Sequence, residues 1–149
     1  MHCCKHVLDE RDMKASDLMS VDIIAATENV SAIEIATRIV LGAINGMPVI
    51  SKDDGKLLGV VTTIDILRAI RSGGDLTTII AREIMSPGPF SVKEDTDVNE
   101  IIDLMDKNGI IMLPVVENDG GRLVGVCSRS DVLKEILNER FVTIGMTRQ

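Results

Sequence analysis

A long stretch of this chain occurs twice, and the two copies align without a gap. Met85 follows Met19 by 66 residues, and Gly125 follows Gly59 by the same number. The segments between these positions also agree, since GMPVI in the first copy falls on MLPVV in the second. An ungapped duplication indicates one supersecondary unit built twice, and two such units usually pack about a pseudo-twofold axis.

Each copy begins with the signals of a short strand and an amphipathic helix. Apolar or β-prone segments predict strands at 22–26 and 89–92. A capping box follows each segment and pairs Ser31 with Glu34 and Asp97 with Glu100. Apolar residues at helical spacing then predict helices at 32–43 and 98–107.

A β-hairpin and a second helix complete each copy. Asn45-Gly46 and Asn108-Gly109 are expected to end the first helices, because Asn and Gly tolerate positive φ. Turn compositions at 53–55 and 118–121 predict hairpins. The hairpin strands are expected at 47–50, 57–61, 113–116 and 123–127, and the closing helices at 63–72 and 129–139. The repeated unit is therefore β-α-β-β-α, and the fold class is α/β (α+β).

The composition predicts an aliphatic core and excludes several classes of partner. Trp and Tyr are absent and there are only two Phe, so Ile, Leu, Val, Met and Ala must fill the interior. The net charge of −7 argues against nucleic acid, because phosphate backbones are bound by Lys and Arg. No stretch approaches the ~18 consecutive apolar residues of a membrane-spanning helix, and the first residues lack a signal-peptide core. Three cysteines form no disulfide framework. We expect a cytoplasmic protein without a membrane partner.

Two hydroxyl-x-x-Asp motifs are the strongest candidates for a binding site. Thr62-x-x-Asp65 and Ser128-x-x-Asp131 each lie between a predicted strand and a predicted helix. Such residues can simply cap the helix. However, each motif follows a glycine that permits close backbone approach, and a carboxylate at a helix N-terminus can also accept two hydrogen bonds from the vicinal diol of a ribose. Both interpretations stay open on the residues alone.

These motifs, in this order, resemble a tandem pair of cystathionine-β-synthase (CBS) domains, also called a Bateman module. The resemblance rests on DLMSVDIIAA, NGMPVI and LLGVVTTIDIL in the first copy, and on EIMSPGPFSV, GIIMLPVV and RLVGVCSRSDVL in the second. It implies two pseudo-twofold-related repeats packed sheet to sheet, at 14–75 and 76–139, between an N-terminal arm at 1–13 and a tail at 140–149. It also implies a homodimer.

The resemblance further implies two clefts that bind adenosine-containing ligands such as AMP, ADP, ATP or S-adenosylmethionine. Each cleft would combine residues of both copies. One cleft would use Ser20, Ile23, Ile24, Ile44, Asn45, Ser128, Arg129 and Asp131. The other would use Ser86, Pro89, Phe90, Ile110, Ile111, Thr62 and Asp65.

The chemistry of these residue types agrees with such a ligand. Three apolar residues, Ile23, Ile24 and Ile44, can sandwich an adenine. Asp131 can take ribose hydroxyls, and Ser128 with Arg129 can meet phosphate. The copies differ here, because Thr63 stands where the second copy has Arg129. Unequal occupancy of the two clefts is expected.

Metal and catalytic chemistry are not expected. His2, Cys3, Cys4 and His6 are possible metal ligands, but they lie too close together in sequence to wrap one tetrahedral ion readily. A flexible arm is the expected state, and a metal shared between chains is the remaining alternative. No nucleophile motif is present, and Cys127 has no His partner in its sequence context.

The sequence thus predicts a non-enzymatic sensor without a resident cofactor. An adenosine ligand would regulate it, and it would pass ligand occupancy to a partner protein that the sequence does not identify. The alternative is a protein–protein adaptor with vestigial clefts, in which the two motifs serve only as helix caps.

Overall fold

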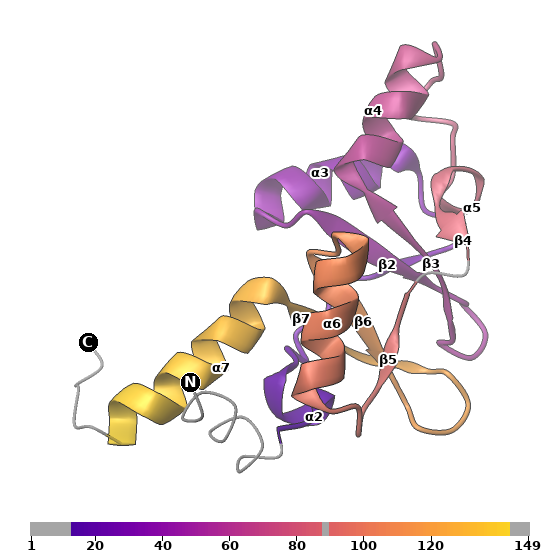
Figure 1. The fold of residues 1–149 in the computed structure, drawn as a ribbon. Coiled ribbons are helices and arrows are strands. Elements are labelled where there is room, and N and C mark those ends of the chain that lie inside the picture. The colour runs from indigo at the N-terminus through magenta and orange to yellow at the C-terminus, as the bar shows by residue number, and fades with distance from the viewer. Residues whose placement is uncertain (1–12, 88–89, 144–149) are drawn as a thin grey trace.

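The computed structural model describes residues 13–87 and 90–143 and contains two small sheets with helices packed around them (Figure 1). The first sheet has the order β1-β2-β3-β4 and the second β5-β6-β7. Each sheet combines one parallel pair with an antiparallel hairpin. The fold class and the duplicated architecture predicted above are confirmed.

The first half contains one complete β-α-β-β-α unit. A two-residue strand pairs in parallel with the first hairpin strand, and the two helices flank that hairpin in the chain. The elements are β1 (Ala26–Thr27), α3 (Ala32–Gly42), β2 (Gly46–Ile50), β3 (Leu57–Thr62) and α4 (Thr63–Arg71). Ser31 caps α3, because its side chain accepts a hydrogen bond from the backbone N–H of Glu34.

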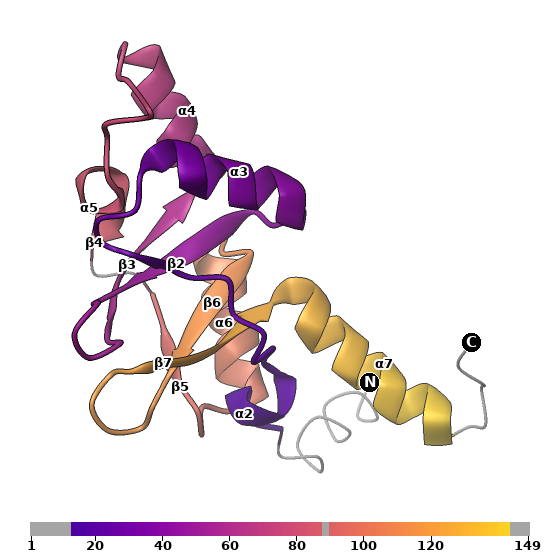
Figure 2. The same ribbon diagram turned by 180° about the vertical axis from the view of Figure 1, so that it is seen from behind.

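The second half repeats this unit. Its elements are β5 (Val92–Lys93), α6 (Val98–Asn108), β6 (Met112–Val116), β7 (Leu123–Ser128) and α7 (Arg129–Thr143). The carboxylate of Asp97 caps α6 by accepting from the backbone N–H of Asn99 rather than from that of Glu100. The end of α7 extends away from both sheets (Figures 1 and 2).

The segment that precedes each unit packs against the opposite half. The short helix α2 (Ala15–Leu18) contributes to the core formed by α6, β6 and β7, and α5 (Ala81–Ile84) contributes to the core under α3. The strand β4 (Ser86–Pro87) pairs with β3, and Ser20 forms the matching bridge with Val126 of β7. The two halves are therefore interlocked rather than joined end to end.

A reciprocal pair of hydrogen bonds joins the two hairpins. The backbone N–H of Leu57 donates to the carbonyl of Gly121, and the N–H of Leu123 donates to the carbonyl of Gly55, both across 3.1 Å. Residues 57 and 123 are equivalent in the duplication, as are residues 55 and 121. These bonds show the pseudo-twofold relation directly.

The central strands β2 and β6 are buried on both faces. Met47 and Val49 point into the helix-covered core of the first half, whereas Pro48 between them is also fully buried on the other face. Leu113 and Pro114 of β6 repeat this arrangement. A strand alternates its side chains between two faces. One face of each hairpin thus packs under helices, and the other turns toward the partner half and the pockets described below.

Several predicted boundaries were wrong by a few residues. The strands predicted at 22–26 and 89–92 occupy only 26–27 and 92–93, since only those residues reach the neighbouring hairpin strand. The first helix ends through Ala43, which adopts positive φ (52°), while Gly46 already belongs to β2. In the second copy Gly109 has positive φ (63°), as expected. The closing helix reaches residue 143 instead of 139.

No helix in the described ranges is long and apolar enough to cross a membrane. The predicted arm, with His2, Cys3, Cys4 and His6, falls outside those ranges except for Met13, and so do Pro89 and residues 144–149 of the predicted tail.

Candidate functional site

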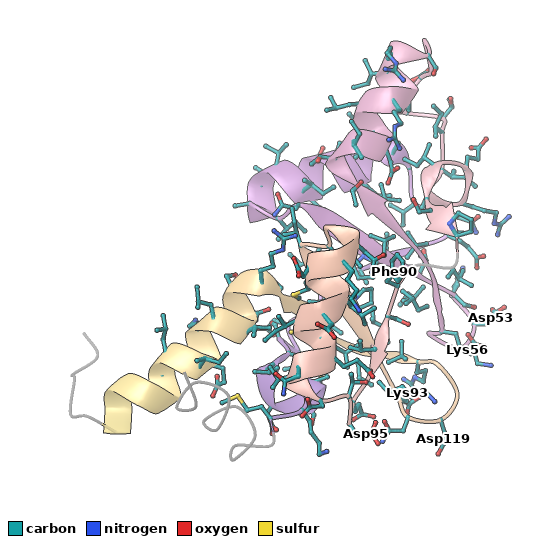
Figure 3. All side chains as sticks on the ribbon, viewed as in Figure 1. Asp53, Lys56, Phe90, Lys93, Asp95 and Asp119 are labelled. Atoms are coloured by element: carbon teal, nitrogen blue, oxygen red, sulfur yellow. The ribbon has the colours of Figure 1, made fainter. Side chains whose placement is uncertain are left out.

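Two pockets lie between the halves and are lined by residues of both. The first has a volume of about 290 Å³ and is called here the Asp131 pocket. The second, of about 620 Å³, is called the Phe90 pocket. Phe90, labelled in Figure 3, lies where the first sheet meets the second half. Both volumes are in or close to the range of small-molecule sites.

Six of the eight residues predicted for the first cleft meet in the Asp131 pocket. They are Ser20, Ile24, Ile44, Asn45, Ser128 and Asp131. The β-bridge to Val126 holds Ser20 at the pocket, and α7 begins directly after Ser128. Residues far apart in sequence thus converge because the segment before the first unit pairs with the sheet of the second.

Asp131 keeps one carboxylate oxygen available to this pocket. Its Oδ2 accepts the backbone N–H of Ser128 across 2.9 Å, and the N–H of Asp131 donates to the Ser128 hydroxyl across 3.1 Å. These two bonds form a capping box. Among the described residues no partner of Oδ1 is found within hydrogen-bond or ion-pair distance. The carboxylate is therefore held in place with acceptor capacity to spare.

Asp65, the equivalent residue of the first copy, is bonded differently. Its Oδ2 accepts both the backbone N–H and the hydroxyl of Thr62, at 2.8 and 3.1 Å, and its Oδ1 lies 3.7 Å from Nη1 of Arg68. It is only 9% exposed and does not line the Phe90 pocket. Here the motif serves as a helix cap.

The Phe90 pocket gathers the other predicted residues except for two. It is lined by Thr62, Ser86, Phe90, Ile110 and Ile111, whereas Asp65 lines a different pocket and Pro89 is not described. Among the described residues its lining carries no charged side chain. The two pockets share the wall formed by Asn45, Gly46, Ile111 and Met112.

Ile23 and Arg129 do not line the Asp131 pocket. Every second residue of the segment from Ser20 to Ile24 faces the pocket, which leaves the intermediate Ile23 outside it. Nε of Arg129 donates to the carbonyl of Ile110 across 2.8 Å. Its side chain lines a groove between α6 and α7 instead.

Sequence reasoning missed two residues of the Asp131 pocket that have polar side chains, Asp22 and Ser130. Ser130 lies in the first turn of α7, and its hydroxyl is 3.0 Å from that of Ser128. Asp22 lies between Ser20 and Ile24 at alternate spacing. That spacing was the available signal, because alternate residues of an extended segment share a face.

Cys127, which precedes Ser128 in β7, has a thiol with a strongly raised pKa. Burial, and secondly the negative charge of Asp131, raise the pKa of its thiol to about 12. The thiol is therefore protonated at neutral pH and is a poor nucleophile. Within the described residues no group of three His, Cys, Asp or Glu side chains is placed to hold a metal ion.

Comparison with known proteins identifies several relatives of this chain. An uncharacterised protein of Methanopyrus kandleri, MK0525, is 30% identical over 83% of this chain and 63% of its own length. The uncharacterised protein YlbB of Bacillus subtilis is 32% identical over 85% of each chain. The chain spans less than two thirds of the length of the first curated relatives that it matches.

Solved structures extend the comparison to the fold. The CBS domain pair of protein MJ0100, solved in complex with 5′-methylthioadenosine and S-adenosyl-L-methionine, is 28% identical. It superposes with a TM-score of 0.72 over 85% of this chain and 98% of that one. A putative acetoin utilisation protein, AcuB, of Vibrio cholerae shares the fold with a TM-score of 0.79 and 24% identity, over 91% of this chain and 98% of its own.

The sequence model of the CBS domain matches this chain twice, at residues 15–72 and 81–138. These two matches coincide with the duplication and cover most of the chain. The chain therefore belongs to the CBS domain family, as a tandem pair of CBS domains.

Proposed function

We propose that this CBS pair is a regulatory module that binds an adenosine-containing ligand in the Asp131 pocket. The observation that carries the proposal is the Asp131 carboxylate, held by Ser128 with one oxygen available in a pocket formed by both halves. The complex of the 28% identical MJ0100 pair with two adenosine derivatives supports it.

The pocket offers a distinct group for each part of such a ligand. Asp131 accepts hydrogen bonds from the two ribose hydroxyls, which a carboxylate can do because it has several lone-pair sites. Ile24 and Ile44 provide apolar contacts for the adenine. Ser20 and Ser130 provide hydroxyls for the remaining substituent.

Ligand binding in this pocket changes the relation between the two halves. Ile24 and Ile44 belong to the first unit, whereas Ser128 and Asp131 begin α7 of the second. A ligand that contacts both groups favours one relative arrangement, by as much as its affinities for the two arrangements differ. The end of α7 projects away from both sheets (Figure 2). We assign to it the role of transmitting that change to a partner protein.

A homodimer and a cytoplasmic location are part of the proposal. Val40 and Leu41 on α3 are 77% and 81% exposed, and Leu67 on α4 and Leu133 on α7 are also exposed. Large apolar side chains that are exposed to solvent are typical of association surfaces when they form a contiguous patch. Sedimentation of the native chain and of Leu41→Asp tests the dimer, which the substitution should weaken.

A thermal-shift panel tests the proposed function. AMP, ADP, ATP, adenosine, 5′-methylthioadenosine and S-adenosylmethionine are each added to the full chain. A ligand that binds only the folded state stabilises it by about 2.7 kcal/mol at a hundredfold excess over Kd, so at least one compound should raise Tm clearly. Unchanged melting curves for all of them would contradict the proposal and favour the adaptor with vestigial clefts.

A non-enzymatic role completes the proposal. The described pocket residues include no His, and the nearby Cys127 thiol is buried and protonated. Nucleophilic catalysis requires an activated nucleophile with a base within hydrogen-bond reach.

A further inference from the structure

The charged side chains that line the Asp131 pocket are all negative. Asp22 and Asp131 are the only ionisable residues in its described lining, and neither Lys nor Arg is among them. The remaining polar groups are hydroxyls and the Asn45 side chain. A dianionic phosphate would therefore meet two carboxylates and no cation.

The cation nearest in sequence, Arg129, is held elsewhere. Its Nε donates to the carbonyl of Ile110, and its side chain lines the groove between α6 and α7 together with Asp106. That groove is separate from the Asp131 pocket, since the two share no lining residue. To reach a phosphate in the pocket, Arg129 would have to give up its bond to Ile110.

The N-terminus of α7 compensates for the missing cation only in part. Backbone N–H groups at a helix start can bind anions when they are unpaired. The N–H of Arg129 donates to the carbonyl of Ile111, and the N–H of Asp131 donates to the Ser128 hydroxyl, so among the described residues only the N–H of Ser130 in this first turn lacks an acceptor. The Asp131 carboxylate itself already occupies the positive end of the helix dipole.

From these contacts we infer that the Asp131 pocket selects nucleosides whose 5′ substituent bears no phosphate, and that Asp22 is a specificity-determining residue. The inference rests on the proposed function and names the ligand class. A neutral thioether or a sulfonium cation meets no repulsion from Asp22, whereas a phosphate does.

The test is calorimetric titration of the full chain with three ligands that share the adenosine group. 5′-Methylthioadenosine and AMP differ in the 5′ substituent, and S-adenosylmethionine adds a cationic sulfonium. We expect 5′-methylthioadenosine to bind at least about tenfold more tightly than AMP at low salt, with a smaller difference at high salt. Ile64→Trp narrows the Phe90 pocket alone, because Ile64 does not line the Asp131 pocket. Unchanged affinities of this variant in the same titrations assign the binding to the Asp131 pocket.

Asp22→Asn isolates the contribution of one carboxylate. It should strengthen AMP binding about threefold or more, weaken S-adenosylmethionine by a similar factor, and leave 5′-methylthioadenosine unchanged. Asp119→Asn is the matched control, because it makes the same charge change in the exposed β6–β7 turn, outside both pockets (Figure 3). It should alter none of the three affinities.

The outcomes separate this inference from the proposed function. AMP binding as tightly as 5′-methylthioadenosine, or equal effects of Asp22→Asn and Asp119→Asn, would overturn the inference and leave adenosine binding intact. Failure of all three compounds and of adenosine itself would overturn the proposed function and the inference with it.

Discussion

The carboxylate of Asp131 accepts the backbone N–H of Ser128 across 2.9 Å through one oxygen only, and the other oxygen stays available to the pocket between the two CBS domains. The equivalent Asp65 uses both oxygens within its own half, with Thr62 and Arg68. Both copies use the motif to cap a helix, but of the two carboxylates only Asp131 lines a pocket between the halves, where we propose that it binds the ligand. This difference leads to a paired prediction.

Asp131→Ala should weaken every adenosine ligand by roughly 10- to 150-fold, because it removes charge-assisted hydrogen bonds worth about 1.5–3 kcal/mol. Asp65→Ala should change affinity little but lower the free energy of unfolding by about 0.5–2 kcal/mol through loss of a cap. Calorimetry and urea unfolding of both variants measure the two effects. Loss of binding in Asp65→Ala with none in Asp131→Ala would show that the ligand occupies the other cleft.

Arg129→Ala distinguishes two roles of this side chain. The sequence predicts that Arg129 binds phosphate, whereas in the structure its guanidinium donates to the carbonyl of Ile110. If Arg129 meets phosphate, its loss should weaken AMP and spare 5′-methylthioadenosine. Because Arg129 is bonded to Ile110, we expect the other result. The ratio of the affinities for AMP and 5′-methylthioadenosine should be unchanged, and the free energy of unfolding should fall by about 1 kcal/mol. Titrations with both ligands and a denaturation curve decide between them.

Gly125→Ala should destabilise the protein by about 1–3 kcal/mol, since overpacking forces neighbouring groups to shift. A Cβ at this position would lie 2.5 Å from Sδ of Met19 and 3.0 Å from the carbonyl oxygen of Ser20. Gly42→Ala is the matched control. Its Cβ would meet nothing closer than 3.4 Å, so the substitution should stabilise α3 by about 0.4–1 kcal/mol. Equal effects of the two in thermal melts would contradict the close approach of Met19 and Ser20 to β7.

Alkaline pH should destabilise the fold through Cys127. Its thiol has a pKa of about 12 in the folded protein against an ordinary value of 9.0, so the unfolded chain loses this proton first as pH rises. The stabilisation is fully present below about pH 9 and is lost as pH approaches 12. Cys127→Ala should show a smaller loss of stability over this range. Iodoacetamide at pH 8 should leave the Cys127 peptide unmodified in the native state, as checked by mass spectrometry.

Local signals determined most of the secondary structure. The cap at Ser31 and the hairpin turns each depend on residues that are close in sequence, so the order of elements in one unit could be predicted. The 66-residue repeat then predicted that this order occurs twice. Pairing partners were less predictable. The chain from 22 to 25 has the composition of a strand, but only 26–27 lie beside β2, so the length of β1 was decided by packing.

The residues that line the pockets show the same difference between what local sequence determines and what packing determines. The motif predicted that Asp65 and Asp131 lie at helix starts, and both do. The contacts of Asp65 with Thr62 and Arg68 are local too, since each partner is three residues away. Only the tertiary structure placed Asp22 and Asp131 in one pocket. The reason is physical: caps and turns involve neighbours within a few residues, whereas each pocket is formed where the two interlocked halves of the chain meet. The charge that a ligand encounters there depends on how those units pack, and no local pattern specifies that.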